Sequence, residues 1–141
     1  MNIASLLHGT ARCFPDAPAL SFGDVLVHRY RGLQERAARL AGGLRALPGI
    51  AAGDRIAFAM KNAPEYVELM WAAWHAGLCI VPMNAKLHPK EFAYILQNCG
   101  VKVCFATPDL TEALAEELRS ADVSARLIDS ESAEYRALAS H

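Results

Sequence analysis

Residues 55–82 read RIAFAMKNAPEYVELMWAAWHAGLCIVP, and this stretch decides the fold class. Residues 56–60 form a short apolar run without alternation, which predicts a strand covered on both faces. Asn62 is placed to cap the helix that follows, and Pro64 falls in the first turn of that helix. Residues 78–81 form a second short apolar run. A strand, a helix and a strand in this order predict a right-handed crossover and a parallel sheet.

The same alternation continues towards the C-terminus. Pro89 is expected to open a second helix, and residues 101–106 are expected to form a third strand. A helix capped at residues 107–109 and a fourth strand at residues 125–128 complete the pattern. The sequence therefore predicts an α/β fold, a three-layer domain with a mainly parallel sheet. The tail, residues 130–141, has little pattern and is expected to be weakly structured.

Three elements are expected before this core. Asn2 can cap a first helix that ends at the prolines following Phe14. Two extended runs around Gly23-Asp24 predict a β-hairpin. Leu residues and Ala residues at helical spacing predict a helix over residues 33–47. The core is thus preceded by a helix, a β-hairpin and a helix.

Charge and composition exclude several classes of protein. Lys and Arg total 14, Asp and Glu total 15, and the formal net charge is -1. This balance argues against binding to nucleic acid and against a polybasic membrane patch. No apolar stretch approaches the ~20 residues of a membrane span. The N-terminus lacks the features of a signal peptide, so we expect a cytoplasmic protein whose four cysteines are reduced, buried thiols.

Motifs that carry chemistry are scarce. The sequence contains no GxGxxG, GxxxxGK[ST], GxSxG or HExxH motif. His75 and Cys79 are four residues apart, but Gly77 is expected to break the helix between them. Glu116 and Glu117 fit a solvated helix face. We therefore predict no catalytic residue and no metal site within these 141 residues.

Two loops are better candidates for ligand binding. Lys61-Asn62 follows the first core strand, and residues 83–86, which include Asn84 and Lys86, follow the second. Loops at the carboxyl ends of parallel strands commonly hold ligands, and a helix N-terminus there favours an anion. The alternative is that Asn62 only caps a helix and that Asn84 and Lys86 only shape a turn.

Seven short segments, read in order, resemble one family. They are FPDAPAL at 14–20, Tyr30 with Leu33, GDRIA at 53–57, Asn62 with Pro64 and Glu65, AG at 76–77, VPMN at 81–84, and residues 87–96 with Leu87, Pro89, Glu91, Tyr94, Ile95 and Leu96. Together they resemble the adenylate-forming superfamily, which includes acyl-CoA synthetases, luciferases and peptide-synthetase adenylation domains. Arg29 stands where the family's TYxEL segment has Thr, and Gln34 follows the Leu of that segment.

This resemblance implies an acid–CoA ligase, because acyl-CoA synthetases commonly have Asn where this chain has Asn84. Such enzymes use ATP to activate a carboxylic acid, here expected to be a fatty acid, as an acyl-adenylate, and then transfer the acyl group to CoA. ATP, Mg²⁺ and CoA are the cofactors that the resemblance implies for the parent protein, with none expected to be bound to this chain. It also implies that Asn84 and Lys86 lie on a loop on the CoA side and bind substrate.

The family's phosphate loop ending in PKG, its adenine-site segments and its C-terminal catalytic Lys do not occur in these residues. Residues 1–141 are therefore expected to be the N-terminal part of a large AMP-binding domain, inactive alone. The alternative is a free-standing α/β binding or interaction module without catalysis. The helix from Asn62 to Gly77 is apolar nearly all round, which predicts contact with the remaining subdomains of the parent, or a homodimer of the fragment.

Overall fold

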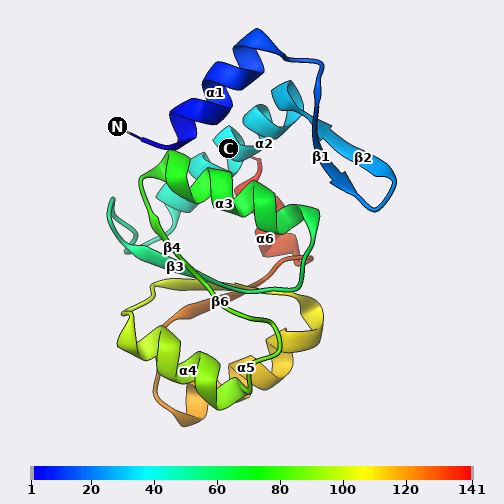
Figure 1. Ribbon diagram of the computed structural model, residues 1–141. Helices are drawn as coiled ribbons and strands as arrows, with labels where there is room; N and C mark the ends of the chain where they lie inside the picture. Colours follow the sequence, from blue (N-terminus) through cyan, green and yellow to red (C-terminus); the bar gives the residue numbers. More distant parts are fainter. Residues whose placement is uncertain (1, 141) are drawn as a thin grey trace.

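Four short strands form the centre of the molecule in the computed structural model, which describes residues 2–140 (Figure 1). They are β3 (Arg55–Ala59), β4 (Cys79–Pro82), β5 (Val103–Ala106) and β6 (Arg126–Asp129). All pairs are parallel, and the strand order is β4-β3-β5-β6. The predicted α/β class and parallel sheet are confirmed.

Helices cover both faces of this sheet and complete the three predicted layers (Figure 1). One face carries α2 (Tyr30–Ala46), α3 (Pro64–Ala76) and α6 (Ala133–Leu138). The other face carries α4 (Pro89–Asn98) and α5 (Pro108–Ser120). From β3 the chain moves one way across the sheet to β4 and then back past β3 to β5, so its direction of travel reverses between β3 and β5. The helices α3 and α4 therefore lie on opposite faces. Ligands of open α/β sheets bind at such a reversal, beyond the carboxyl ends of the strands.

Side-chain alternation along the central strand builds two separate cores. Ile56 and Phe58 point to the layer of α2, α3 and α6, whereas Ala57 and Ala59 point to α4 and α5. All four are fully buried, which agrees with the predicted strand covered on both faces. Burial of a side chain as large as Phe58 contributes about 1.5–3 kcal/mol, so the larger buried side chains of β3 face the layer of α2, α3 and α6.

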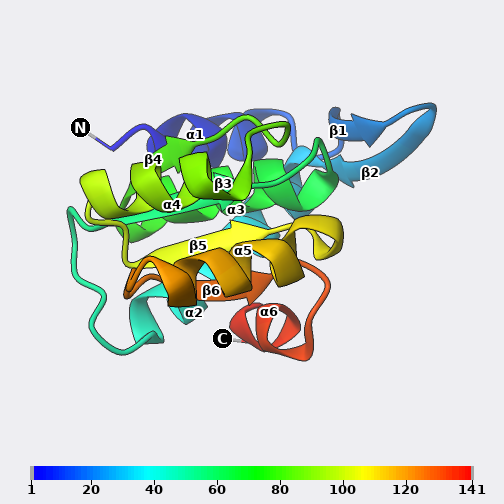
Figure 2. The same cartoon turned by 90° about the horizontal axis from the view of Figure 1, so that it is seen from below.

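The N-terminal elements occur in the predicted order, but the N-cap of the first helix is Ile3 and not the predicted Asn2. They are α1 (Ala4–Cys13) and a hairpin of β1 (Pro18–Phe22) and β2 (Val25–Arg29), which projects from the body in both views (Figures 1 and 2). Gly23 takes a φ of 58° at the turn, a conformation that glycine adopts without strain. α2 begins at Tyr30, three residues earlier than predicted.

Two local expectations are wrong. The tail is not weakly structured throughout, because Ala133–Leu138 form α6 and its residues Tyr135 and Leu138 are buried in the core. Asn62 does not cap α3, whose N-cap residue is Ala63 with no side-chain cap. Pro64 takes the first helical position and favours an extended residue directly before it, which leaves Asn62 one residue too early to cap.

Two expectations about exposure also need correction. The apolar helix α3 is not a bare surface, because α1 and α2 pack against it and leave Tyr66, Trp71 and Trp74 only partly exposed. The large hydrophobic side chains that are exposed lie elsewhere, mainly on α1 and the hairpin. They are Ile3, Leu6, Phe14, Phe22, Val25, Leu26 and Tyr94. Of the cysteines, which are all free thiols, only Cys104 is buried.

Candidate functional site

The two predicted loops meet in one pocket at the carboxyl ends of β3 and β4. The pocket has a volume of about 410 Å³. It is lined by Met60, Lys61, Asn62, Tyr66, Met83, Asn84, Ala85 and Lys86. The parallel pairing of β3 with β4 produces this meeting, because it places both following loops at the same edge of the sheet.

The loop after β4 is held in shape by its own polar groups. The Met83 amide donates to the Phe58 carbonyl at 3.1 Å and so extends the ladder between the strands. The side-chain oxygen of Asn84 accepts a hydrogen bond from the Lys86 amide at 3.0 Å, which makes an Asx-type turn. Asn84 therefore shapes the turn, as the simpler interpretation predicted, and the exposed Lys86 is presented beside the pocket.

The loop after β3 carries a cation that already has a partner. The Lys61 ammonium lies 2.6 Å from the carboxylate of Asp109, in the first turn of α5. Hydrogen bonds from Lys61 and Thr107 lower the pKa of Asp109. This contact spans the gap between β3 and β5, where the direction of travel reverses. Within residues 2–140, Lys86 makes no ion pair, so it is the cation of this pocket that a ligand can use.

The pocket combines this cation with an apolar wall. Tyr66 packs edge-to-face on Phe58, with ring centroids 5.1 Å apart. Burial raises the pKa of the Tyr66 hydroxyl, which therefore stays a neutral donor. The thioether side chains of Met60 and Met83 line the same pocket. Such a surface suits a ligand that has an anionic group and an apolar stretch.

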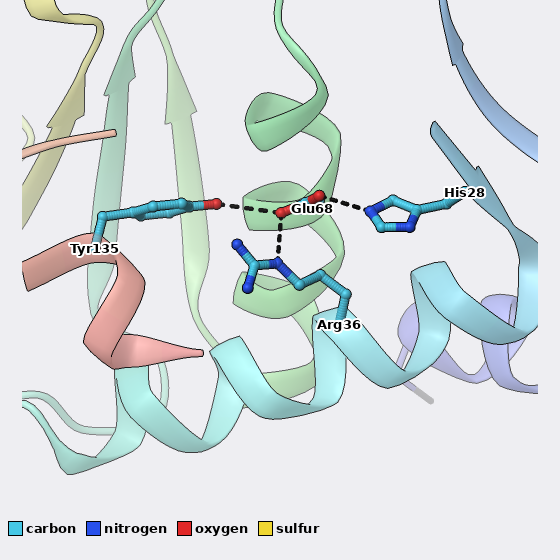
Figure 3. A network of polar contacts seen from close by, with 4 residues as sticks. All are labelled: His28, Arg36, Glu68 and Tyr135. Carbon is cyan, nitrogen blue, oxygen red and sulfur yellow. Dashed lines mark hydrogen bonds and ion pairs between the residues drawn. The ribbon is translucent and has the colours of Figure 1, made fainter. Parts of the chain in front are cut away.

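A second polar cluster, centred on Glu68, was not predicted from the sequence (Figure 3). The Glu68 carboxylate accepts hydrogen bonds from His28 at 2.7 Å, Arg36 at 2.8 Å and Tyr135 at 3.3 Å. The four residues come from α3, β2, α2 and α6 respectively. The available signal was a carboxylate within the apolar part of the helix, beyond Glu65 of the first turn, because a buried charge requires partners.

Charge neutralisation explains why the Glu68 side chain can be buried, with only 5% of the residue exposed. Burial alone raises the pKa of its carboxyl, but the hydrogen bonds and positive charges of Arg36 and His28 outweigh burial and lower it. Burial, and then the negative charge of Glu68, raise the pKa of the Tyr135 hydroxyl. The Arg36 guanidinium also lies 5.7 Å from the centre of the Tyr135 ring. The cluster joins four elements of the fold, and His28, Arg36 and Glu68 also line a surface pocket of about 500 Å³.

Neither a metal centre nor a membrane span occurs in the part of the chain that the structure describes. Residues 2–140 contain no group of three His, Cys, Asp or Glu side chains that could hold a metal ion. None of the helices in the same range has the length and hydrophobicity needed to cross a bilayer.

Comparison with known proteins defines the class. The model of the family described as "AMP-binding enzyme" matches residues 7–140, so the chain belongs to this family of adenylate-forming enzymes. The chain is 39% identical over 105 residues to a feruloyl-CoA synthase of Amycolatopsis, covering 74% of this chain and 21% of that protein. It is 40% identical over 126 residues to a long-chain-fatty-acid–CoA ligase of Thermus thermophilus, covering 85% and 23% respectively.

Solved structures agree with this assignment. The inhibitor-bound N-terminal domain of FACL13 from Mycobacterium tuberculosis superposes with a TM-score of 0.86 at 29% identity, covering 97% of this chain and 35% of that one. A benzoate CoA ligase from Burkholderia xenovorans gives a TM-score of 0.84 at 27% identity, covering 93% and 26%. The chain spans about a fifth of the length of the curated relatives named above. The predicted resemblance to the adenylate-forming family is confirmed.

Proposed function

We propose that residues 1–141 form the N-terminal part of the large AMP-binding domain of an acid–CoA ligase. The parent protein activates a carboxylic acid with ATP and transfers the acyl group to the thiol of CoA. The observation that carries this proposal is the family match over residues 7–140. It is supported by relatives named as CoA synthases and CoA ligases. Their names include both a feruloyl and a long-chain fatty acyl group, so they support the type of reaction and not one particular acid. We propose a fatty acid as the substrate.

The proposed binding residues for the CoA side are Asn84 and Lys86. Asn84 holds the turn, and Lys86 presents a cation beside an apolar pocket. This donor set fits CoA, which has phosphate groups at one end and an uncharged thiol arm at the other. When bound, CoA supplies the thiol that accepts the acyl group. ATP and Mg²⁺ are proposed for the parent through family membership alone.

A charge reversal in the longer protein tests this assignment. Lys86→Glu is expected to raise the CoA concentration needed for thioester formation and to leave ATP–pyrophosphate exchange nearly unchanged, because exchange does not require CoA. Lys102→Glu is the matched control, since Lys102 is exposed and lies at the amino-terminal end of β5, the opposite edge of the sheet. Equal loss of both half-reactions in Lys86→Glu would contradict the proposed role.

The isolated 141-residue chain is expected to be inactive. Adenylation requires groups that stabilise charge on phosphorus, and the chain has no Gly-rich phosphate loop. Purified chain, incubated with a panel of carboxylic acids, should give no ATP–pyrophosphate exchange above a buffer control. Exchange that survives further purification would refute this part of the proposal.

We propose the projecting hairpin as the surface that contacts the remaining subdomains of the parent or, in the isolated chain, a second copy. Phe22 and Val25 are 57% and 67% exposed at its tip, and Leu26 is also exposed. The isolated chain should therefore sediment as a dimer at micromolar concentration, and Val25→Ser should shift it towards the monomer. A wild-type chain that sediments as a monomer would remove the dimer proposal.

A further inference from the structure

A cavity on the helical layer is separate from the carboxyl-edge pocket. α1, α2 and α3 border a half-open cavity with a volume of about 360 Å³. Its lining includes Ser5 and His8 from α1, Gln34 from α2, and Trp71 and His75 from α3. None of these residues lines the pocket that contains Lys86.

Helix geometry directs these side chains to one place. Ser5 and His8 are three residues apart, and Trp71 and His75 are four residues apart. Residues at these separations lie on the same face of a helix. The cavity is thus bordered by one turn of α1 and one turn of α3, with Gln34 contributed by α2.

The N-terminal end of the cavity is fixed by a short set of hydrogen bonds. The side-chain nitrogen Nδ2 of Asn2 donates to the Trp74 carbonyl at 2.8 Å, and the Asn2 side-chain oxygen accepts from the Ala4 backbone amide at 2.9 Å. These bonds tie the start of α1 to the last turn of α3. The Trp71 ring is held edge-to-face against Trp74, with centroids 5.1 Å apart. The aromatic wall is therefore positioned before any ligand arrives.

The cavity offers hydrogen-bond donors that are not used within the described chain. Among residues 2–140, the side chains of His8, Gln34 and His75 have no hydrogen-bond partner, and no Asp or Glu lines the cavity. Burial, followed by the positive charges of Arg45 and His8, lowers the pKa of His75. Because no carboxylate lines the cavity, a bound anion would bring the first negative charge to its lining.

We propose that this cavity binds a small aromatic anion, with its ring against Trp71 and its anionic group accepting hydrogen bonds from His8, His75 and Gln34. The aromatic wall selects a planar ring, because such rings gain from stacked or edge-to-face contact. The volume is near the lower limit of small-molecule sites, which restricts the ligand to about one ring. The site is additional to the proposed CoA-side loop and does not depend on it.

Titration of the 141-residue chain with three probes tests this assignment. The probes are benzoate, benzyl alcohol (a ring without charge) and cyclohexanecarboxylate (a charge without an aromatic ring), and the readouts are calorimetry and tryptophan fluorescence. Trp71 and Trp74 are the two tryptophans of the chain, so fluorescence reports on this wall. Benzoate is expected to bind in the millimolar range and about tenfold more tightly than either of the other probes.

Variants locate the binding. His8→Ala with His75→Ala removes both imidazole donors and should weaken benzoate binding about tenfold, and both positions are exposed, so the fold should remain intact by circular dichroism. Lys86→Ala is the matched control and should bind benzoate as the wild type does. Absence of benzoate binding, equal binding of benzyl alcohol, unchanged binding by the double variant or loss of binding in Lys86→Ala would each overturn the proposal.

Discussion

Glu68→Gln is the change that tests most directly how the four joined elements are held together. The glutamine side chain has the same shape but one accepting oxygen, so it cannot accept from both His28 and Arg36. Hydrogen bonds to charged groups contribute about 1.5–3 kcal/mol each. The side chains of His28 and Arg36 are 22% and 29% exposed, so water compensates part of the loss. We expect a decrease of about 2–3 kcal/mol in the free energy of unfolding.

Urea unfolding at pH 7, followed by circular dichroism, measures this loss as a lower midpoint with an unchanged slope. The same loss should lower the midpoint of thermal unfolding by roughly 4–12 °C. Glu116→Gln is the matched control, because Glu116 is an exposed carboxylate on α5, and its effect should stay within about 0.5 kcal/mol. Equal stability of Glu68→Gln and the wild type would refute the reasoning.

The pH dependence gives an independent check. The pKa of Glu68 is lower in the folded chain than in the unfolded chain. Its contribution to stability is therefore complete above the ordinary glutamate pKa of about 4.3 and is lost as the pH falls through the lower, folded value. The difference in stability between wild type and Glu68→Gln should shrink over this acidic range. A difference that grew on acidification would contradict the assigned sign.

Two further predictions concern the packing of the core. Gly43→Ala should destabilise the chain by about 1–3 kcal/mol, because an added Cβ would lie 2.7 Å from the Leu138 Cα; in a chain ending before α6, the same substitution should be neutral or stabilising in a thermal melt. Burial raises the pKa of the Cys104 thiol to about 12, so a thiol reagent at pH 8 should modify the exposed Cys13 and Cys79 quickly and Cys104 only after urea is added; rapid modification of Cys104 in the native chain would contradict its burial.

The sequence predicted the central strands well, because their character is local. The run at residues 56–60 and the helix signals after it need no knowledge of distant residues. α6 was missed for the opposite reason: it has six residues, and its stability comes from long-range contacts of Tyr135 with Glu68 and of Leu138 with the core. Short helices depend on tertiary packing rather than on propensity.

The candidate site was predictable only in part. The meeting of the Asn84 and Asn62 loops follows from parallel strands, which the alternation of elements predicts. The pairing of Lys61 with Asp109 depends on β5 lying next to β3. Strand order cannot be read from short apolar runs, because each run is compatible with several positions in a sheet. The sequence could therefore identify Lys86 as a cation of this pocket. It could not show that Lys61 is less available to a ligand because it pairs with Asp109.

The Glu68 cluster also has a consequence during synthesis on the ribosome. Tyr135 follows Glu68 by 67 residues, and α6 emerges after helices α1 to α5. At about 5–20 residues per second, this stretch takes about 3 to 13 seconds to synthesise. Throughout that time the nascent chain has the β3–α3 core without the side chains of α6 that complete it. During this time the apolar residues that α6 covers are exposed to chaperones and proteases. They become buried only after residues 133–138 have emerged.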